Sequence, residues 1–357
     1  MYSMEELIHI MIEREASDIH LVVGTPPQIR VDGELIPLKT ERLTPEVCQE
    51  LTYSVLTETQ KRKFEESNEL DLSFGVREIG RIRMNVFRQR GTVGAALRSI
   101  PNRTLSFEEL GLPPAIYEMA KLTKGLVLVT GPTGSGKSTT LAAIIEYINQ
   151  NRKEHIVTVE DPIEYLYSHK NCIISQREVE SDTETFAAAL KYVLRQDPDI
   201  IMVGEMRDLE TIRATLTIAE TGHLVLATLH TPDAVQSINR IVDVFPPHQQ
   251  PQVRAQLSFV IQAVFSQQLM PKAGGKGRVL ACEVLIATPG LRNLIREEKV
   301  HQAYTLMQAG GREGMQTMNM SLADLYSRGL ITAQEALSRS LDPNDLKRFM
   351  DRSAAMY

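Results

Sequence analysis

Gly131-Pro132-Thr133-Gly134-Ser135-Gly136-Lys137-Ser138 fits the phosphate-binding pattern G-x-x-x-x-G-K-[ST] at every fixed position. The apolar run at 126–129 predicts a short buried strand before it, and residues 139–145 predict a helix after it. Glycines allow backbone N–H groups to converge on an anion, and the N-terminus of the helix adds a partial positive charge at the same point. The stretch therefore predicts a nucleotide phosphate site in an α/β protein.

The side chains at the end of this loop define the ligand more closely. Lys137 is expected to reach the β- and γ-phosphates of ATP, and the Ser138 hydroxyl is expected to bind Mg²⁺. Thr139 follows directly and completes the predicted nucleotide-binding set. We therefore expect ATP and Mg²⁺ as the ligands and a Mg-dependent ATPase as the activity.

The composition is that of an ordinary globular protein. The chain has 357 residues, a net charge of −6, 43% hydrophobic residues and no tryptophan. Nucleic-acid motors usually present a basic surface with stacking aromatics. The composition argues against direct nucleic-acid binding, although the net charge does not exclude a basic channel inside a ring.

The cysteines and the apolar runs indicate which cellular compartment suits the protein and whether it spans a membrane. Cys48, Cys172 and Cys282 are far apart, which argues against a disulfide framework or a zinc site and suits a reducing cytosol. The first 14 residues contain three glutamates and do not resemble a signal peptide. Residues 259–270 form the richest apolar run, but three glutamines interrupt it, so we expect no transmembrane segment.

The pattern along the chain predicts two domains. Residues 1–98 contain short alternating runs between turn signals, which predict a small α/β domain with an antiparallel sheet. A linker is expected at 99–112. Residues 113–357 form the second domain, in which strand–helix alternation predicts a mainly parallel sheet and the region from about 288 is helical.

An acidic residue follows the apolar strand predicted at 200–203. Ligands of open α/β sheets lie at the carboxyl ends of the strands, so Glu205 is placed to orient the water that attacks the γ-phosphate. Gly204 stands where the usual aspartate would hold magnesium. The alternative is that Glu205 caps the helix that follows.

A second acidic group follows the strand predicted at 156–159. Glu160, Asp161 and Glu164 would reach the same crevice, and three carboxylates together are costly unless a cation or a positioned water uses them. We assign Glu160 and Glu164 to water or magnesium. Asp161 precedes a proline and can equally serve a turn.

Histidines and arginines supply further candidates. His230 follows the strand predicted at 224–228 and is placed to sense the γ-phosphate, whereas His223 lies at the opposite end and is as easily structural. Arg81 and Arg83 share one face of a predicted strand, where they could reach a nucleotide or simply face solvent. Arg207, two residues beyond Glu205, is another candidate.

These motifs together resemble the secretion ATPase superfamily and, within it, the PilT-like twitching-motility ATPases that retract type IV pili. The resemblance rests on residues 17–21 and 25–27 (N-terminal PAS-like domain), 131–138 (Walker A), 159–164 (Asp box), 201–208 (atypical Walker B) and 222–230 (His box). It implies a RecA-like P-loop core with a smaller PAS-like α/β domain. It also implies catalytic roles for the arginines and both histidines, and makes the missing aspartate at Gly204 a family trait.

One helical segment connects the chain to the retraction branch of this superfamily. Residues 290–297 are similar to the signature Ala-Ile-Arg-Asn-Leu-Ile-Arg-Glu, with Gly290 for alanine and Leu291 for isoleucine. The polar members are shared, and we assign them to motor output: Arg292, Asn293, Arg296 and Glu297.

The resemblance implies a cytoplasmic homo-hexameric ring, peripheral at the inner membrane, that acts on a pilus platform protein. ATP is expected at the cleft between the two domains, and hydrolysis is expected to rotate them about a hinge near Asn102. Three alternatives remain: an extension-type or type II secretion ATPase, a RecA-like nucleic-acid motor, and a non-catalytic assembly switch. The signature segment and the short N-terminal region, with no additional domain ahead of the PAS-like one, argue against the first. The acids Glu164 and Glu205 argue against the last.

Overall fold

The structure is a computed structural model that describes residues 2–31, 33–76, 80–100, 104–275 and 277–354. The chain divides into two compact units. One comprises Met1–Arg103 with Glu164–Leu166, and the other comprises Thr104–Ile163 and Tyr167–Tyr357. The expected hinge residue Asn102 lies outside the described residues.

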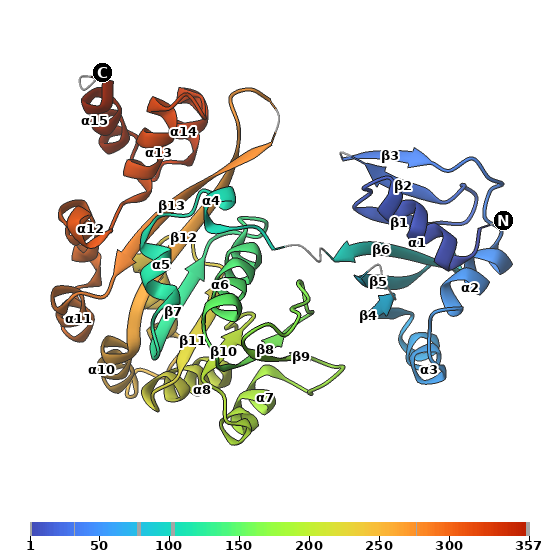
Figure 1. Cartoon of the computed structure of the whole chain (residues 1–357), viewed down its shortest axis with the longest axis horizontal. Coiled ribbons are helices and arrows are strands. Elements are labelled where there is room, and N and C mark those ends of the chain that lie inside the picture. The colour runs from blue at the N-terminus through green and yellow to red at the C-terminus, as the bar shows by residue number, and fades with distance from the viewer. Residues whose placement is uncertain (1, 32, 77–79, 101–103, 276, 355–357) are drawn as a thin grey trace. The chain divides into compact units, whose positions relative to one another are not determined.

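The first unit is an α/β domain with an antiparallel sheet (Figure 1). The strand order is β3-β2-β1-β6-β5-β4, and every neighbouring pair is antiparallel, as the short alternating runs predicted. Its elements are α1 (Met4–Glu13), β1 (Asp18–Leu21), β2 (Gln28–Val31), β3 (Glu34–Pro37), α2 (Pro45–Tyr53), α3 (Glu58–Ser67), β4 (Glu69–Val76), β5 (Gly80–Gln89) and β6 (Thr92–Ile100).

Period-two spacing sets the faces of β5. Ile82, Met84 and Val86 are fully buried in the core of this unit, whereas Arg81 and Arg83 lie on the opposite, partly exposed face. This confirms the predicted alternation, which follows from side chains pointing to opposite faces of a strand.

The second unit contains a larger sheet covered by helices. Helices and strands mostly alternate from α4 to α10, except that β8 leads directly into β9 and that α4 and α5, and α9 and α10, are consecutive helices. Its elements are α4 (Phe107–Leu110), α5 (Ala115–Ala120), β7 (Gly125–Thr130), α6 (Lys137–Asn151), β8 (His155–Glu160), β9 (Ile173–Glu178), α7 (Phe186–Val193), η1 (Leu194–Gln196), β10 (Ile200–Val203), α8 (Leu209–Glu220), β11 (Leu224–Leu229), α9 (Ala234–Asp243), α10 (Gln250–Val260), β12 (Ile261–Pro271), β13 (Arg278–Ile286), α11 (Pro289–Arg296), η2 (Val300–Gln302), α12 (Ala303–Ala309), η3 (Gly311–Glu313), α13 (Met318–Ser327), α14 (Ala333–Arg339) and α15 (Pro343–Ala354).

This sheet is parallel except at one edge. Its order is β13-β12-β7-β11-β10-β8-β9, and only the β12–β13 pair is antiparallel. Both faces are buried: on β7, Leu126 and Leu128 pack in one hydrophobic cluster, and Val127 and Val129 pack in another. Apolar residues on both faces are what a sheet sandwiched between helices requires.

The apolar run 259–270 is mostly a strand. Its first two residues are the last two of α10, and the rest belong to β12, which pairs with both β7 and β13. Its glutamines are not solvated breaks: Gln267 is fully buried, and its Nε2 donates to Thr140 Oγ1 at 2.8 Å. Within the described part of the chain, no helix is long and apolar enough to cross a membrane.

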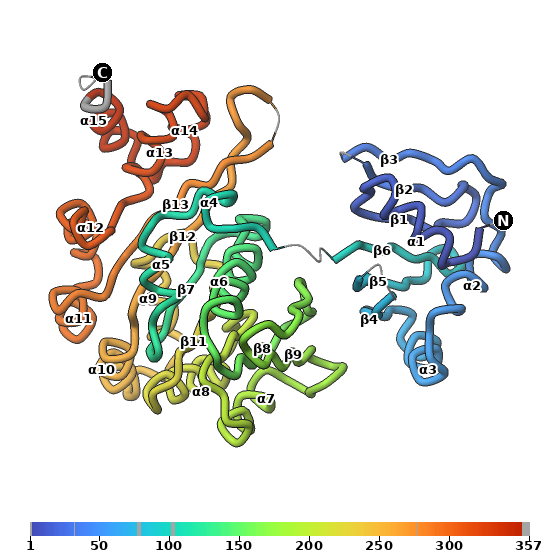
Figure 2. Tube along the Cα trace, in the orientation of Figure 1, coloured from blue at the N-terminus to red at the C-terminus, as the bar shows by residue number. Residues whose placement is uncertain are grey.

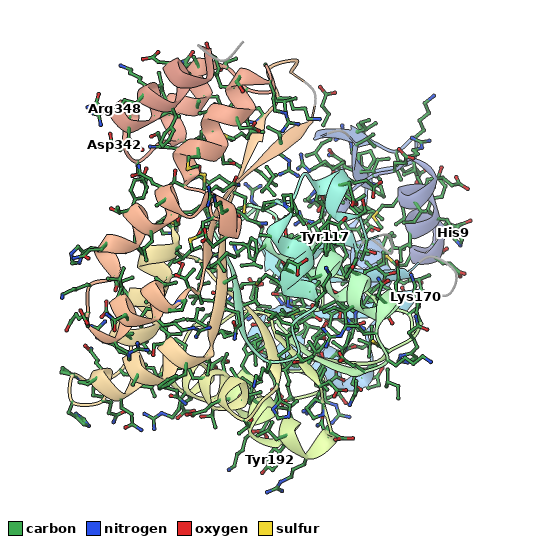
Figure 3. All side chains as sticks on the ribbon, turned by 60° about the vertical axis from the view of Figure 1, so that its left-hand side comes forward. His9, Tyr117, Lys170, Tyr192, Asp342 and Arg348 are labelled. Atoms are coloured by element: carbon green, nitrogen blue, oxygen red, sulfur yellow. The ribbon has the colours of Figure 1, made fainter. Side chains whose placement is uncertain are left out.

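The range expected for the linker contains a helical turn. Phe107 of α4 is buried and stacks on Tyr147 of α6 with ring centroids 5.2 Å apart. Tyr117, which is labelled in Figure 3, packs edge-on against both rings. The aromatic contacts attach α4 to the parallel-sheet unit.

Within the described residues, five α-helices and two short 3₁₀ helices follow β13, as predicted for the region from about 288. The trace in Figure 2 runs from α11 and α12 to a separate group formed by α13, α14 and α15. This group has its own hydrophobic cluster, which includes Leu322, Ile331, Ala336 and Leu346 and extends to Met270 of the β12–β13 pair.

A buried carboxylate joins this helical group to the sheet. Glu283 of β13 is 3% exposed; its Oε1 accepts the Ala234 N–H at the start of α9 at 2.8 Å, and its Oε2 accepts the Met318 N–H at the start of α13 at 3.3 Å. Burial raises the pKa of Glu283 to about 7; the two N–H bonds oppose this effect, and the charge of Asp233 adds to it. One side chain thus fixes the N-termini of two helices.

We predict that Glu283→Gln changes how thermal stability depends on pH. Because the pKa of Glu283 is raised on folding, the stability that it contributes is complete below the unfolded value of 4.5 and is lost as pH rises through about 7. The melting temperature of the variant relative to the wild type should therefore rise by a few degrees between pH 5 and pH 8.

The exposed Glu34→Gln variant controls for the loss of a carboxylate elsewhere. A melting-temperature difference that does not depend on pH, or that moves in favour of the wild type at pH 8, would mean that the helix N–H groups outweigh burial.

Candidate functional site

The loop between β7 and α6 has the geometry of an anion cradle. Gly131, Gly134 and Gly136 adopt positive φ angles of 139°, 78° and 90°. A Cβ on Gly131 would lie 2.4 Å from the carbonyl oxygen of Gln267, so glycine is required there. No side chain caps the N-terminus of α6. The first N–H groups of the helix are therefore left for a phosphate, and the loop fits the predicted nucleotide.

Lys137 is held inside this loop. Its Nζ donates to the carbonyl oxygens of Gly131 and Pro132 at 2.9 and 3.1 Å, and the residue is 9% exposed. The ammonium therefore lies at the centre of the cradle. Ser138, the predicted magnesium ligand, lies one residue further along, in the first turn of α6.

Parallel register brings the other predicted residues to the same edge of the sheet. Strands β7, β11, β10 and β8 are consecutive neighbours and all parallel, so their carboxyl ends lie side by side. The phosphate loop follows β7, and the strands beside it lead to His230, Glu205 and Glu160 in that order.

Glu205 lies at the centre of this row. Its Oε2 is 2.8 Å from a guanidinium nitrogen of Arg207 and 3.2 Å from Nε2 of His230, whose Nδ1 lies 3.5 Å from Oγ1 of Thr133 in the phosphate loop. Burial raises the pKa of Glu205, but the Arg207 hydrogen bond and the charge of His230 together hold it below its ordinary value. The carboxylate is therefore ionised at neutral pH and can accept a proton.

Glu205 does not cap the helix that follows. The N-cap of α8 is Asp208, whose carboxylate accepts the Thr211 N–H at 2.9 Å. The capping alternative therefore belongs to Asp208, and Glu205 remains turned toward His230.

The second acidic group separates into a buried and an exposed member. Glu160 is 5% exposed, and its Oε1 accepts from the Thr158 hydroxyl at 2.7 Å and the Gln176 amide at 3.3 Å. Glu164 is exposed. The charge of Asp161 raises the pKa of Arg207, after the larger effect of the Glu205 hydrogen bond, which places Asp161 near this edge.

His223 lies at the other end of β11. Its Nδ1 is 3.0 Å from Oγ1 of Thr221 and 3.3 Å from the carbonyl oxygen of Ile218, both at the C-terminal end of α8. These contacts are those of a structural histidine at a helix terminus. The structure does not bring His223 to the Glu205 row.

Arg81 and Arg83 belong to the other unit of the chain. The Arg81 guanidinium donates to the Ser73 hydroxyl on the neighbouring strand β4, with its Nε 2.9 Å from the hydroxyl oxygen. Arg83 also faces Ser73, in the register of the same strand pair. A contact of either residue with nucleotide stays a prediction.

The predicted output segment is α11, and its polar residues differ in role. Arg292 donates to the carbonyl oxygens of Ser258 (2.6 Å) and Phe259 (2.9 Å), which close the last turn of α10. Asn293, by contrast, is exposed and donates to Oε1 of Glu297 at 2.8 Å. Arg296 is exposed beside the Phe259 ring. The surface of the segment is therefore Asn293, Arg296 and Glu297, whereas Arg292 stabilises the fold.

Two contacts at the cradle were missed by the sequence reasoning. Gln267 on β12 backs the loop through its carbonyl at Gly131 and its amide at Thr140, and Thr133 reaches His230. A buried glutamine inside an apolar run was the available signal for Gln267. Nothing in the local pattern pairs Thr133 with a residue 97 positions away.

A glycine cradle, an uncapped helix and an acid on the neighbouring strands define a RecA-like P-loop ATPase. The family model described as "Type II/IV secretion system protein" matches residues 2–338. The chain belongs to this family, which confirms the resemblance predicted from the motifs.

Individual relatives cover almost the whole chain. It is 49% identical over 340 residues to the type IV pilus retraction ATPase PilT of Pseudomonas aeruginosa, covering 95% of this chain and 98% of that protein. It is 43% identical to the type IV pilus ATPase PilU of the same organism, covering 96% and 90%. A crystal structure of the pilus retraction motor PilT with bound ADP superposes with a TM-score of 0.92, at 55% identity, over 98% of this chain and 100% of that chain.

We predict that Glu205→Gln keeps nucleotide affinity and lowers ATP turnover at least ~100-fold, because the amide cannot accept a proton. Phosphate release and ADP binding, measured on the same preparation, separate the two effects. Glu34→Gln, which removes an exposed carboxylate in the other unit of the chain, is the control and should retain turnover. If turnover survives in Glu205→Gln and fails in Glu164→Gln, the water-activating role belongs to Glu164.

Proposed function

We propose that this chain is the ATPase subunit of a homo-hexameric ring motor that powers retraction of type IV pili. The observation that carries the proposal is the 49% identity to a pilus retraction ATPase over 95% of the chain. The phosphate loop, His230 and Glu205 are all present at the carboxyl ends of the parallel strands. Superposition on a retraction motor with bound ADP supports ADP and ATP as the nucleotides.

Each residue of the edge has a chemical task in this proposal. Residues 131–139 hold the phosphates through backbone N–H groups and Lys137. Mg²⁺ bound through the Ser138 hydroxyl would neutralise charge between the β- and γ-phosphates. Glu205 orients the attacking water and accepts its proton, and Glu160, with Glu164, supports water or metal from the adjacent strand.

His230 and the arginines are proposed to respond to the terminal phosphate. His230 lies between Glu205 and Thr133 of the loop, so its two ring nitrogens face the acid and the phosphate cradle. Arg207 is ion-paired with the same Glu205 carboxylate that contacts His230, and it is a candidate to respond to the change in charge when the nucleotide is hydrolysed. Arg81 and Arg83 are proposed to complete the site from the N-terminal domain, as arginine fingers do.

The remaining proposals concern organisation. We propose a PAS-like domain at 1–98, a linker at 99–112 and the ATPase domain at 113–357, with its helical region from about 288. The ring would be cytoplasmic and peripheral at the inner membrane, where α11 acts on a pilus platform protein. Such a ring would require a head-to-tail interface between subunits that closes on itself.

The test is a count of surface pili, scored with surface motility, in a strain that lacks the gene. Abundant pili without motility are expected, since extension would continue without retraction. Complementation with the wild-type gene should restore motility, and complementation with the Glu205→Gln gene should not. A strain without pili would show that the ATPase drives extension and would overturn the proposal.

We predict that Asn293→Ala and Arg292→Ala separate output from stability. Asn293 is exposed, so its loss should spare ATP turnover and melting temperature but abolish motility. Loss of Arg292 leaves two carbonyl oxygens at the end of α10 without their donor and should lower the free energy of unfolding by about 1–3 kcal/mol. Full motility in Asn293→Ala would remove Asn293 from the output surface.

A further inference from the structure

The acid at the centre of the site lies on irregular backbone. Strand β10 ends at Val203, and α8 begins at Leu209, so Glu205 stands in a segment with no helix or strand of its own. A catalytic carboxylate has to be held within a fraction of an ångström of its working position. Something outside this segment must therefore fix it.

Thr228 of β11 contacts the segment on both sides of Glu205. Its hydroxyl donates to the Gly204 carbonyl oxygen at 2.5 Å, and its own carbonyl oxygen accepts the Met206 N–H at 3.1 Å. Thr228 is 4% exposed, so these bonds are sheltered from water. The residues immediately before and after Glu205 are thus attached to one residue of the neighbouring strand.

Strand β8 holds the same segment from the other side. The Gly204 N–H donates to the Val159 carbonyl oxygen at 2.8 Å, and a Cβ at position 204 would lie 3.2 Å from that oxygen and 3.3 Å from Cα of Glu160. The backbone at Gly204 is therefore held between two strands, and a side chain there would press on the backbone of β8. This close approach also gives a physical reason for glycine where an aspartate is usual.

The position of Thr228 links this segment to the rest of the site. In the sheet register it pairs with Val129 of β7, two residues before the phosphate loop begins at Gly131. In sequence it precedes His230 by two residues. Thr228 therefore lies on the strand that leads to His230 and is also hydrogen-bonded to the segment that contains Glu205.

We propose that Thr228 is a positioning residue for Glu205: its hydroxyl fixes the Gly204 carbonyl and thereby aims the carboxylate toward the γ-phosphate position. The inference rests on the proposed role of Glu205 in ATP hydrolysis. Valine has the shape of threonine and retains the backbone bond to Met206, so only the hydroxyl bond is removed in Thr228→Val. Serine retains the hydroxyl.

The experiment measures kcat, KM, ADP affinity and melting temperature for Thr228→Val, Thr228→Ala and Thr228→Ser. We expect kcat to fall about 10- to 100-fold in the valine and alanine variants, with ADP affinity within about two-fold, and serine to restore most of kcat. The control is Thr215→Val on α8, a fully buried threonine whose hydroxyl has no partner among the described residues; its kcat should be unchanged.

Should Thr228→Val not fold, the comparison of serine with alanine decides the question. Equal kcat values in those two variants would overturn the proposal, as would a kcat in Thr228→Val equal to that of the Thr215→Val control.

A double variant distinguishes positioning from a general structural role. If Thr228 acts through Glu205, Thr228→Val in the Glu205→Gln background should lower the residual single-turnover rate by less than about three-fold, because coupled residues are not additive. An undiminished effect in that background would overturn the proposal. If Glu205→Gln itself hydrolyses ATP at the wild-type rate, the proposed role of Glu205 fails instead, and the two failures are distinguishable.

Discussion

The parallel register of β7, β11, β10 and β8 is the constraint on which the site depends. These strands carry the phosphate loop, His230, Glu205 and Glu160 at their carboxyl ends. Adjacent parallel pairing brings residues as far apart in sequence as Thr133 and His230, which are 97 positions apart, to one edge of the sheet. A slip of one residue in β11 would turn every side chain of that strand to the opposite face.

Much of this arrangement was predictable from sequence because its signals are local. The phosphate loop is defined by eight consecutive residues, and the buried strand before it is defined by an apolar run. Glu205 could be placed at the site edge from two facts, the preceding strand and the rule that ligands lie at carboxyl ends of parallel strands. The alternation in β5 similarly determined which face carries Arg81 and Arg83.

What could not be predicted depends on contacts between distant segments. Burial raises the pKa of Glu205, and it is lowered below its ordinary value by Arg207 and by His230, which follows a different strand. The buried role of Gln267 depends on β12 joining β7, and a glutamine-interrupted run does not show which face is covered. Arg292 illustrates the same limit: a helical pattern indicates its surface, but only the folded chain places its guanidinium on the last carbonyls of α10.

Hydrogen bonds around α9 connect the edge of the sheet that carries the site to the rest of the parallel-sheet unit. Ser237 of α9 bonds to Thr231, the residue after His230, and to Thr130, the residue before the phosphate loop. The first N–H of the same helix bonds to Glu283, which also holds the start of α13. Because breaking such bonds leaves buried polar groups unsatisfied, at about 1–3 kcal/mol each, a shift of the His230 segment is cheaper when α9 moves with it. The C-terminal helical group is attached to that same carboxylate through the Met318 N–H at the start of α13.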